Sequence, residues 1–362
     1  MRVLFLGLRG LPNIQGGVET HCEELCRRLA ENGFDVTVYG RSGYVSTGYW
    51  RGVRIIGHWA PKVVGLEAVL HTFFGALYAG ITRPDVVHVH AVGPALFVPL
   101  LRVFGLKVVI THHGPDYDRQ RWGTFARFIL RLGERCGVRY SHQQIVISRT
   151  IQELLTSKYG VDPSLIPNGV TVRNGIPPGA VLNRFDVEER KYIVTVSRLV
   201  PEKRHLDLIE GFRKANLPDV KLLIIGGADI NDSYADSVMK VEVENVVFTG
   251  RLDGRELIEA FSNAALFVLP SSHEGLPIAL LEALSFGLPV VLSNIPPHME
   301  LNLGQRCYFE LGDTDRLCEA IKYWYREDDG AKRNQRVNWV REKYDWDKIA
   351  SEVTKVYQGL QI

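Results

Sequence analysis

The chain has 362 residues, of which 46% are hydrophobic and 23% are charged. This is ordinary for a globular protein and argues against disordered, collagen-like and coiled-coil classes. The length predicts two domains. No uncharged stretch reaches the roughly 18 residues of a membrane-spanning helix, and the apolar run Val3 to Leu8 is too short for a signal peptide. Five cysteines without framework spacing indicate reduced thiols, so we expect a cytoplasmic protein.

The charge is unevenly distributed, although the net charge is only +2. Residues 1–185 contain 21 Lys and Arg against 12 Asp and Glu, a balance of +9, and the remainder carries −7. A basic half indicates an anionic partner, which could be a nucleic acid, a membrane surface or a phosphorylated substrate. The sequence shows no RNA- or DNA-binding motif, so we expect no nucleic-acid partner.

Short apolar strands alternate with helical patterns along the whole chain. The first half predicts a helix at 17–32 and strands at 2–8, 35–39, 85–90, 107–112 and 143–148. The second half predicts strands at 192–197, 221–225, 245–248, 265–269 and 289–292. This alternation is typical of parallel sheets covered by helices on both faces, so the predicted fold class is α/β.

The segment 167–183 is rich in Gly, Pro and Asn and lacks periodicity, which predicts an interdomain connection. We therefore expect two doubly wound, Rossmann-like domains at 1–175 and 190–345, followed by a helix at 346–362 that packs back toward the first. Ligands of such sheets bind beyond the carboxyl ends of the strands, so two facing domains predict an interdomain cleft.

A glycine-rich loop, Gly7 to Gly17, leads from the first strand into the first helix. Free backbone N–H groups and the helix dipole attract anions at such a turn, and Gly16 and Gly17 allow close approach of a ligand. The glycines match neither the dinucleotide nor the P-loop pattern. The loop on its own could equally be a βα turn without function.

Two cations of the second half, Arg198 and Lys203, lie between a predicted strand and a predicted helix. Arginine can bind phosphate through two hydrogen bonds and lysine acts as a point charge, so the pair suits a diphosphate. The alternative is that both are solvated surface side chains.

Two carboxylates, Glu274 and Glu282, lie eight residues apart where a predicted strand turns into an apolar helix. A carboxylate within an apolar helical run needs partners if it is buried, and sugar or ribose hydroxyls would supply them. Alternatively, Glu282 faces solvent.

These three elements, Gly16 to Glu19, Arg198 with Lys203, and Glu274 with Glu282, resemble the retaining GT-B glycosyltransferases of family four in order and context. The opening Leu8 to Pro12 also resembles the rhamnosyltransferase-like branch that builds bacterial surface polysaccharides. The resemblance implies metal-independent, retaining transfer of a sugar from a nucleotide diphosphate sugar to a glycan or polyprenyl-linked acceptor. A nucleotide-sugar epimerase of similar fold and a non-catalytic nucleotide-sugar-binding protein are the alternatives.

The resemblance also implies individual roles. Gly16, Gly17, Arg198 and Lys203 would bind the donor diphosphate, with the backbone of Gly275 and Leu276 nearby. Glu282 would hold the ribose hydroxyls, and Glu274 would lie beside the donor sugar. His113 matches a first-domain histidine that lies near the reacting sugar. If the match is shifted by one residue, the adjacent His112 takes this place. Alternatively, His113 only packs at the end of a strand.

We expect no metal and no cofactor besides the donor. Asp116 and Asp118 imitate the Asp-x-Asp metal site of the other large glycosyltransferase fold, but they follow a Gly-Pro in a chain with two predicted sheets. Four histidines could also be considered as ligands, namely His88, His90, His112 and His113. The first two merely alternate on one strand face, and Arg198 and Lys203 can replace the charge of a metal.

A cationic stripe lies on a helix predicted at 122–140, where arginines recur every four residues: Arg127, Arg131, Arg135 and Arg139. This stripe could bind anionic lipid at the inner face of the cell membrane or a lipid diphosphate acceptor, or it could be a solvated helix face. A second candidate, the apolar segment Val63 to Ile81, could equally belong to the core.

Overall fold

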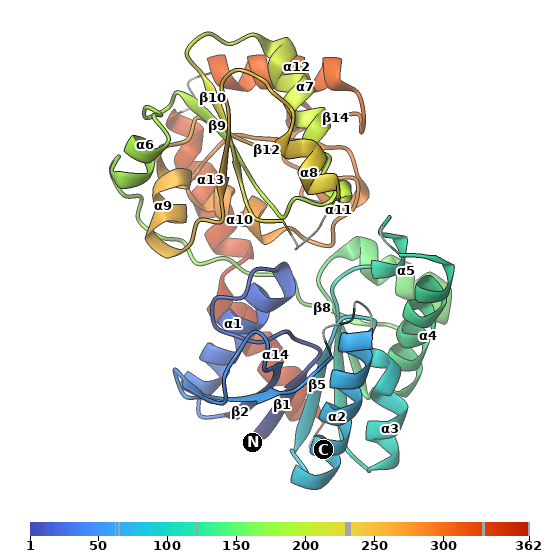
Figure 1. Ribbon diagram of the computed structural model, residues 1–362. Helices are drawn as coiled ribbons and strands as arrows, with labels where there is room; N and C mark the ends of the chain where they lie inside the picture. The colour runs from blue at the N-terminus through green and yellow to red at the C-terminus, as the bar shows by residue number, and fades with distance from the viewer. Residues whose placement is uncertain (62, 64–65, 121, 229–232, 328–329, 361–362) are drawn as a thin grey trace. The chain divides into compact units, whose positions relative to one another are not determined.

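The computed structural model describes residues 1–61, 63, 66–120, 122–228, 233–327 and 330–360. The chain divides into two compact units, Met1–Gly169 with Trp346–Ile362, and Val170–Asp345 (Figure 1). The first continuous segment ends at Gly169, whereas the sequence placed the end of the first domain at 175.

The first unit is built on an eight-stranded sheet with the order β3-β4-β2-β1-β5-β6-β7-β8. All neighbouring strands are parallel except the edge pair β3 and β4. In the centre, Val3 of β1 pairs with Val36 and Val86, and all three are buried because helices cover a parallel sheet on both faces. The strands are β1 (Arg2–Leu6), β2 (Asp35–Arg41), β3 (Gly48–Trp50), β4 (Val53–His58), β5 (Val86–His90), β6 (Val108–His112), β7 (Gln143–Val146) and β8 (Ser164–Leu165).

The last helix of the chain completes the core of the first unit. Its apolar side chains, including Trp346 and Val353, pack with Leu25 of α1 in one buried cluster. The unit's helices and 3-10 turns are α1 (Gly17–Glu31), α2 (Leu66–Thr82), η1 (Pro94–Phe97), α3 (Val98–Val103), η2 (Asp116–Asp118), α4 (Thr124–Tyr140), α5 (Arg149–Tyr159) and α14 (Trp346–Gly359).

The second unit contains a fully parallel six-stranded sheet with the order β11-β10-β9-β12-β13-β14. Helices α7 and α12 pack together on it, and α10 packs against α13. The strands are β9 (Tyr192–Val196), β10 (Lys221–Ile225), β11 (Val246–Gly250), β12 (Leu266–Leu269), β13 (Val290–Ser293) and β14 (Tyr308–Phe309). The helices and 3-10 turns are α6 (Ala180–Arg184), η3 (Pro201–Lys203), α7 (His205–Ala215), α8 (Ser233–Met239), α9 (Gly254–Asn263), α10 (Ile278–Ser285), α11 (Pro296–Met299), η4 (Gln305–Cys307), α12 (Thr314–Arg326) and α13 (Gly330–Lys343).

The predicted α/β class with two Rossmann-like units is therefore confirmed. The strands that the sequence missed, β3, β4, β8 and β14, include three of only two or three residues. Such short strands carry too few residues to show a periodicity.

The predicted connection 167–183 differs from the structure, because its end is an ordered part of the second unit. Helix α6 begins at Ala180, and the buried Glu259 of α9 accepts hydrogen bonds from the backbone N–H groups of Gly179, Val181 and Leu182 at 2.9, 2.9 and 3.1 Å. A helix start needs such acceptors. The acceptor is distant in the chain, so local sequence gives no sign of it.

Within the described ranges, no helix is long and apolar enough to cross a bilayer.

Helix α2, which matches the apolar segment predicted as core or membrane contact, has two different faces. Its small residues Gly75, Ala76 and Ala79 are buried, and a Cβ on Gly75 would lie 2.8 Å from Leu6. Ile81 on the other side is 82% exposed. One face of α2 is therefore core, and the other is apolar surface.

Candidate functional site

The first loop ends in two glycines with different surroundings. Gly16 has φ +151°, and a Cβ there would lie 2.2 Å from Glu19 and 2.6 Å from Arg9. These two side chains form an ion pair, with Arg9 Nε donating to Glu19 Oε1 at 2.9 Å. Gly17, the first residue of α1, is exposed, and apart from its chain neighbours and its own helix backbone no described heavy atom lies within 4 Å of its Cβ position. The N-terminus of α1 is therefore open to a ligand.

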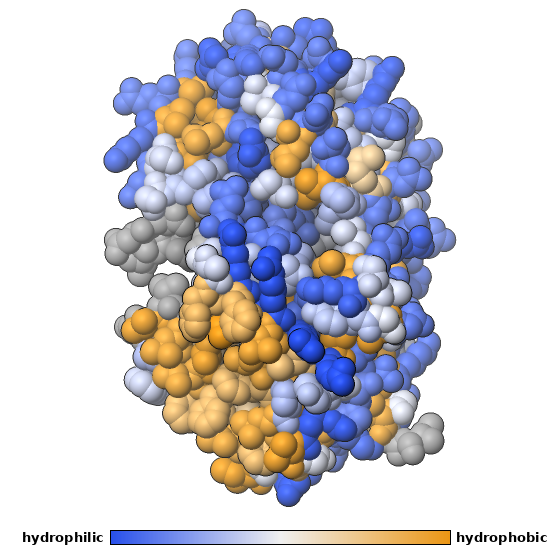
Figure 2. Space-filling model, turned by 90° about the vertical axis from the view of Figure 1, so that its right-hand side faces the viewer, coloured by the Kyte–Doolittle hydropathy of each residue, from blue (hydrophilic) through white to orange (hydrophobic). Residues whose placement is uncertain are grey.

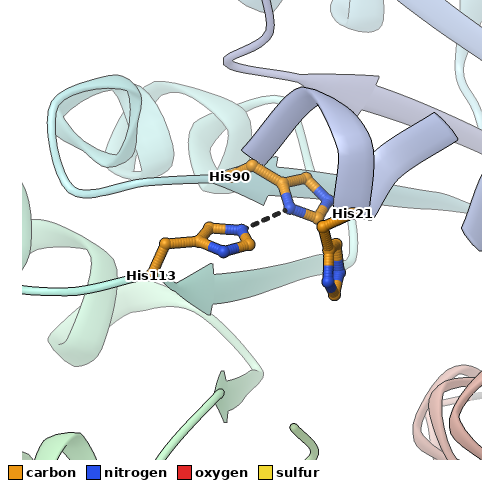
Figure 3. A group of neighbouring side chains, drawn as sticks. All are labelled: His21, His90 and His113. Atoms are coloured by element: carbon orange, nitrogen blue, oxygen red, sulfur yellow. Dashed lines mark hydrogen bonds between the residues drawn. The ribbon is translucent and has the colours of Figure 1, made fainter. Parts of the chain in front are cut away.

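Three histidines gather at the carboxyl edge of the first sheet (Figure 3). His21 lies on α1, His90 ends β5, and His113 follows β6 directly. His90 Nδ1 lies 3.0 Å from His113 Nε2 in a hydrogen bond, and the rings of His21 and His113 meet edge to face with centroids 5.0 Å apart. His21 Nδ1 donates to Asn168 Oδ1 at 2.9 Å. We name these three residues the histidine cluster.

Burial keeps the histidine cluster uncharged. It lowers the pKa of His21 to about 4, although the hydrogen bond to Asn168 opposes this shift. Burial, and then the neighbouring histidines, hold the pKa values of His90 and His113 well below their ordinary value. All three imidazoles are therefore neutral near pH 7, so each carries one N–H and one lone pair.

The four histidines considered as ligands do not form one group. His88 uses both ring nitrogens, Nδ1 with Tyr357 at 2.6 Å and Nε2 with Thr111 at 2.7 Å. His21, which joins the cluster instead, is a single histidine on an amphipathic helix. Such a residue carries no recognisable signal in the sequence.

His112 and His113 have different surroundings. His112 Nε2 donates to the buried Glu134 at 3.0 Å, and its Nδ1 accepts the backbone N–H of Gly114 at 3.2 Å. His112 therefore fixes the end of β6 to α4, whereas His113 belongs to the histidine cluster.

Glu134 is a fully buried carboxylate with several donors. Besides His112, it accepts hydrogen bonds from Tyr117 at 2.9 Å, Tyr159 at 2.7 Å and the ammonium group of Lys158. Burial opposes ionisation, but the bonds from His112, Lys158 and Tyr159 outweigh it and lower the pKa of Glu134 to about 2. This charged group anchors the loop that carries His113.

The Asp-x-Asp sequence lies on the 3-10 turn η2. Asp116 forms an ion pair with Arg119 at 2.7 Å, and Asp118 is exposed. Tyr117 between them is buried and points its hydroxyl at Glu134. Through Tyr117, this turn contributes a hydrogen bond to the Glu134 network.

In the second unit, the loops after the neighbouring strands β9 and β12 meet. Ser272 donates its backbone N–H to the carbonyl of Glu202 at 2.8 Å and its hydroxyl to the same oxygen at 3.2 Å. The ammonium of Lys203 forms an ion pair with Glu274, whose side chain is 10% exposed. Arg198, at the start of the first loop, is half-buried. The topology thus unites Lys203 and Glu274, which are 71 residues apart.

The ion pair controls the charge of Glu274. Burial favours the neutral acid, but Lys203 outweighs this effect and holds the pKa of Glu274 below its ordinary value. The carboxylate of Glu274 is therefore ionised near pH 7.

Helix α10 begins directly after this loop. Leu276 is buried and Gly275 is half-buried ahead of it, and Leu280, Leu281 and Leu284 have no exposed surface. Glu282, in contrast, is half-buried. Glu282 is therefore neither fully exposed to solvent nor part of the core.

Sequence reasoning missed His298 on α11. This side chain is fully buried, and its Nδ1 lies 2.9 Å from the carbonyl of Ser293. Burial lowers the pKa of His298 to about 4, with the charge of Glu274 opposing and that of Lys203 adding. The neutral His298 is thus part of the surroundings of the ion pair, and nothing in its local sequence indicates this.

The arginine stripe lies on α4. Arg131, Arg135 and Arg139 are exposed and Arg127 is half-buried, whereas Gly133, Glu134, Gly137 and Val138 form the buried face. Helix α2 packs against α3, and α3 against α4. Figure 2 shows a broad hydrophobic patch on this side of the first unit. The large exposed hydrophobic side chains described on the three helices are Leu66, Ile81, Val103, Phe125, Phe128, Leu132 and Tyr140.

Comparisons with known proteins identify two regions. Residues 15–174 match the family described as Glycosyltransferase Family 4, and residues 183–346 match Glycosyl transferases group 1. Together they cover about nine-tenths of the chain. The glycogen synthase of Mycobacterium tuberculosis is 28% identical over 99% of this chain and 94% of its own length. The UDP-Gal:alpha-D-GlcNAc-diphosphoundecaprenol alpha-1,3-galactosyltransferase of Escherichia coli is 27% identical over 66% of this chain and 65% of its own length.

Solved structures share the fold. Sucrose-phosphate synthase from Thermosynechococcus elongatus superposes with a TM-score of 0.83 at 19% identity, covering 99% of this chain and 98% of its own. HepE of Anabaena in complex with UDP-glucose gives a TM-score of 0.82 at 16% identity, covering 99% and 100%.

The Glu134 network predicts a stability that depends on pH. The folded pKa is about 2 against an ordinary 4.5, so the ionised carboxylate contributes roughly 3 kcal/mol that is present above about pH 5 and lost as the pH falls toward 2. Glu134→Gln should therefore unfold more easily in denaturant at pH 7, and its deficit should shrink in acid. Glu153→Gln, at an exposed position of α5, is the matched control. A deficit that stays constant from pH 7 to pH 3 would contradict the network.

Proposed function

Because the chain belongs to the group 1 glycosyltransferases of the GT-B fold and has a family 4-type N-terminal domain, we propose that it is a retaining enzyme that uses a nucleotide diphosphate sugar. The acceptor in this proposal is a glycan or a polyprenyl-linked sugar, as in the rhamnosyltransferase-like branch that makes surface polysaccharides. The names of two comparison proteins support donor and acceptor: HepE binds UDP-glucose, and the Escherichia coli relative acts on a diphosphoundecaprenol sugar. The family matches favour transfer over epimerisation or binding alone.

The observation that carries the proposal is the meeting of Lys203 and Glu274 on two adjoining loops, the first of which begins near Arg198. When the bond between the anomeric carbon of the sugar and the diphosphate oxygen breaks, negative charge develops on the leaving diphosphate. Preorganised cations and backbone N–H groups stabilise such charge. We assign Arg198, Lys203 and the N–H groups of Gly275 and Leu276 to this role.

The remaining donor contacts follow the resemblance. Glu274 is assigned to the donor sugar and Glu282 to the ribose hydroxyls. In the first unit, Gly16 and Gly17 are assigned to the diphosphate and His113 to the reacting sugar. The open N-terminus of α1 at Gly17 is suited to an anion. The acceptor hydroxyl would form its bond to the anomeric carbon on the face from which the diphosphate departs, and the departing diphosphate would accept the hydroxyl proton.

Donor binding tests the diphosphate assignment. Arg198→Ala and Lys203→Ala should each weaken binding of nucleoside diphosphates by roughly 1.5 to 3 kcal/mol, because each removes a charged hydrogen-bond donor. Calorimetry with UDP, GDP, ADP and dTDP would identify the nucleotide base that the protein prefers. Slow hydrolysis of the matching nucleotide sugars would then identify the sugar of the donor. Unchanged affinity in both folded variants would contradict the assignment.

The ion pair allows a sharper second arm of this experiment. Glu274→Gln removes the carboxylate that competes for Lys203, so nucleoside diphosphate affinity should hold or rise while the rate of transfer falls. Glu310→Gln, at an exposed position of the same unit, is the control for charge. Weakened diphosphate binding with normal turnover in the Glu274→Gln variant would reverse the roles assigned to this carboxylate.

We further propose that the reaction needs no metal, since two side-chain cations are available to neutralise the leaving group. Transfer should then continue at its full rate after treatment with EDTA. Loss of transfer that Mn²⁺ or Mg²⁺ restores would contradict this and direct attention to Asp116 and Asp118.

The surface of the first unit supports a peripheral location at the inner face of the cell membrane. The exposed arginines of α4 lie beside exposed Phe125 and Phe128, which are 78% and 61% accessible. A basic helix with large apolar residues is typical of interfacial attachment. Each cation near an anionic surface contributes about 1 kcal/mol, so a few arginines give reversible binding that salt weakens.

Vesicle pelleting tests the attachment. The protein should pellet with anionic but not with neutral vesicles at low salt, and the triple variant Arg127→Gln, Arg131→Gln, Arg135→Gln should stay in the supernatant. The matched control removes three exposed arginines of the second unit: Arg251, Arg255 and Arg316. Equal pelleting of both triple variants would identify the stripe as a solvated face.

A further inference from the structure

The histidine cluster contains buried ring nitrogens that its hydrogen bonds leave unused. Among the described residues, neither Nε2 of His21 nor Nε2 of His90 has a hydrogen-bond partner, and these side chains are 2% and 0% exposed. Buried polar atoms are normally satisfied by protein, water or an ion. Of these two, Nε2 of His21 belongs to a ring that meets the ring of His113 edge to face, so the cluster contains a buried nitrogen whose partner is missing (Figure 3).

The spacing of the cluster suits a small ion. One ring nitrogen of each of the three residues lies within 4.8 Å of those of the other two, and His90 Nδ1 is 3.0 Å from His113 Nε2. In a tetrahedral zinc site with bonds of about 2.0 to 2.1 Å, ligand nitrogens are about 3.3 Å apart. The His90–His113 pair is already near this separation, so only a modest approach of His21 is required.

The hydrogen bond to Asn168 prepares His21 as a ligand. The amide oxygen of Asn168 accepts the proton on Nδ1, so the lone pair lies on Nε2, the nitrogen without a partner. Metal-binding histidines are commonly oriented in this way by a group on the other ring nitrogen. His21 is thus held in the tautomer that can bind a metal.

We propose that His21, His90 and His113 together bind one transition-metal ion, with Zn²⁺ as the physiological ion and Cu²⁺ or Ni²⁺ as substitutes in vitro. Three neutral imidazoles suit these ions, whereas Mg²⁺ and Ca²⁺ prefer oxygen ligands. Binding through Nε2 of His21, Nδ1 of His90 and Nε2 of His113 would replace the His90–His113 hydrogen bond, whose proton would move to the other nitrogen of the same ring. A fourth position would be left for water.

The functional consequence rests on the proposed function, in which His113 faces the donor sugar. An ion held by His113 would withdraw this side chain from the donor. The cluster is therefore an inhibitory site, so zinc should slow transfer and EDTA should restore it.

Metal binding is measured first, without donor. The full chain, stripped by EDTA and dialysed, should take up one equivalent of Zn²⁺ in calorimetry and none of Mg²⁺, and Co²⁺ should give the visible absorption of a tetrahedral site. His21→Ala and His90→Ala should each abolish this absorption, and Asn168→Ala should weaken Zn²⁺ binding by about 10- to 100-fold. His58→Gln, a half-buried histidine outside the cluster, should behave as wild type.

The wild-type measurement keeps the proposal testable even where a variant fails to fold. Absence of a stoichiometric Zn²⁺ equivalent and of the Co²⁺ absorption would overturn the metal site, as would unchanged binding in folded His21 and His90 variants. Metal binding without inhibition of transfer would instead overturn the assignment of His113 to the donor sugar. The two failures are therefore distinguishable.

Discussion

In a sheet of parallel strands, all carboxyl ends lie at one edge, and this constraint places almost every candidate residue of the protein. His90 and His113 are 23 residues apart, yet they meet because β5 and β6 are neighbours. Lys203 and Glu274 meet in the same way at the ends of β9 and β12. Each unit therefore collects polar side chains at one edge of an otherwise apolar sheet.

Burial then gives the two units opposite electrostatic characters. In the first, the histidines lose their protons because each is desolvated beside other histidines. In the second, the carboxylate of Glu274 remains charged because Lys203 is its ion-pair partner. The neutral histidine cluster has nitrogen lone pairs that can accept a ligand. In the ion pair, a more highly charged anion can displace Glu274 and bind Lys203. The first suits a metal or a sugar hydroxyl, and the second suits a diphosphate.

The histidine cluster also depends on distant parts of the chain. Trp346 of the last helix lies edge to face with His21 at 5.4 Å, and Asn168 fixes the ring from the end of the first segment. On the other side, Glu134 of α4 holds His112 and with it the residue that follows. The last helix and α4 thus support the same edge of the sheet from separate positions in the sequence.

Local pattern was enough to identify the two Rossmann-like units, since the alternation of apolar strands and amphipathic helices directly reflects which residues are buried. Local pattern also drew attention to Arg198, Lys203 and Glu274 near strand ends and to Glu282 on the apolar helix that follows. The roles of these residues stay predictions. The sequence alone did not reveal the Glu259 cap of α6, the ion pair of Lys203 with Glu274, the Glu134 network, or the presence of His21 and His298 beside other polar groups. Those contacts join residues far apart in the chain, and they depend on strand order and on side-chain burial, which only the tertiary structure decides.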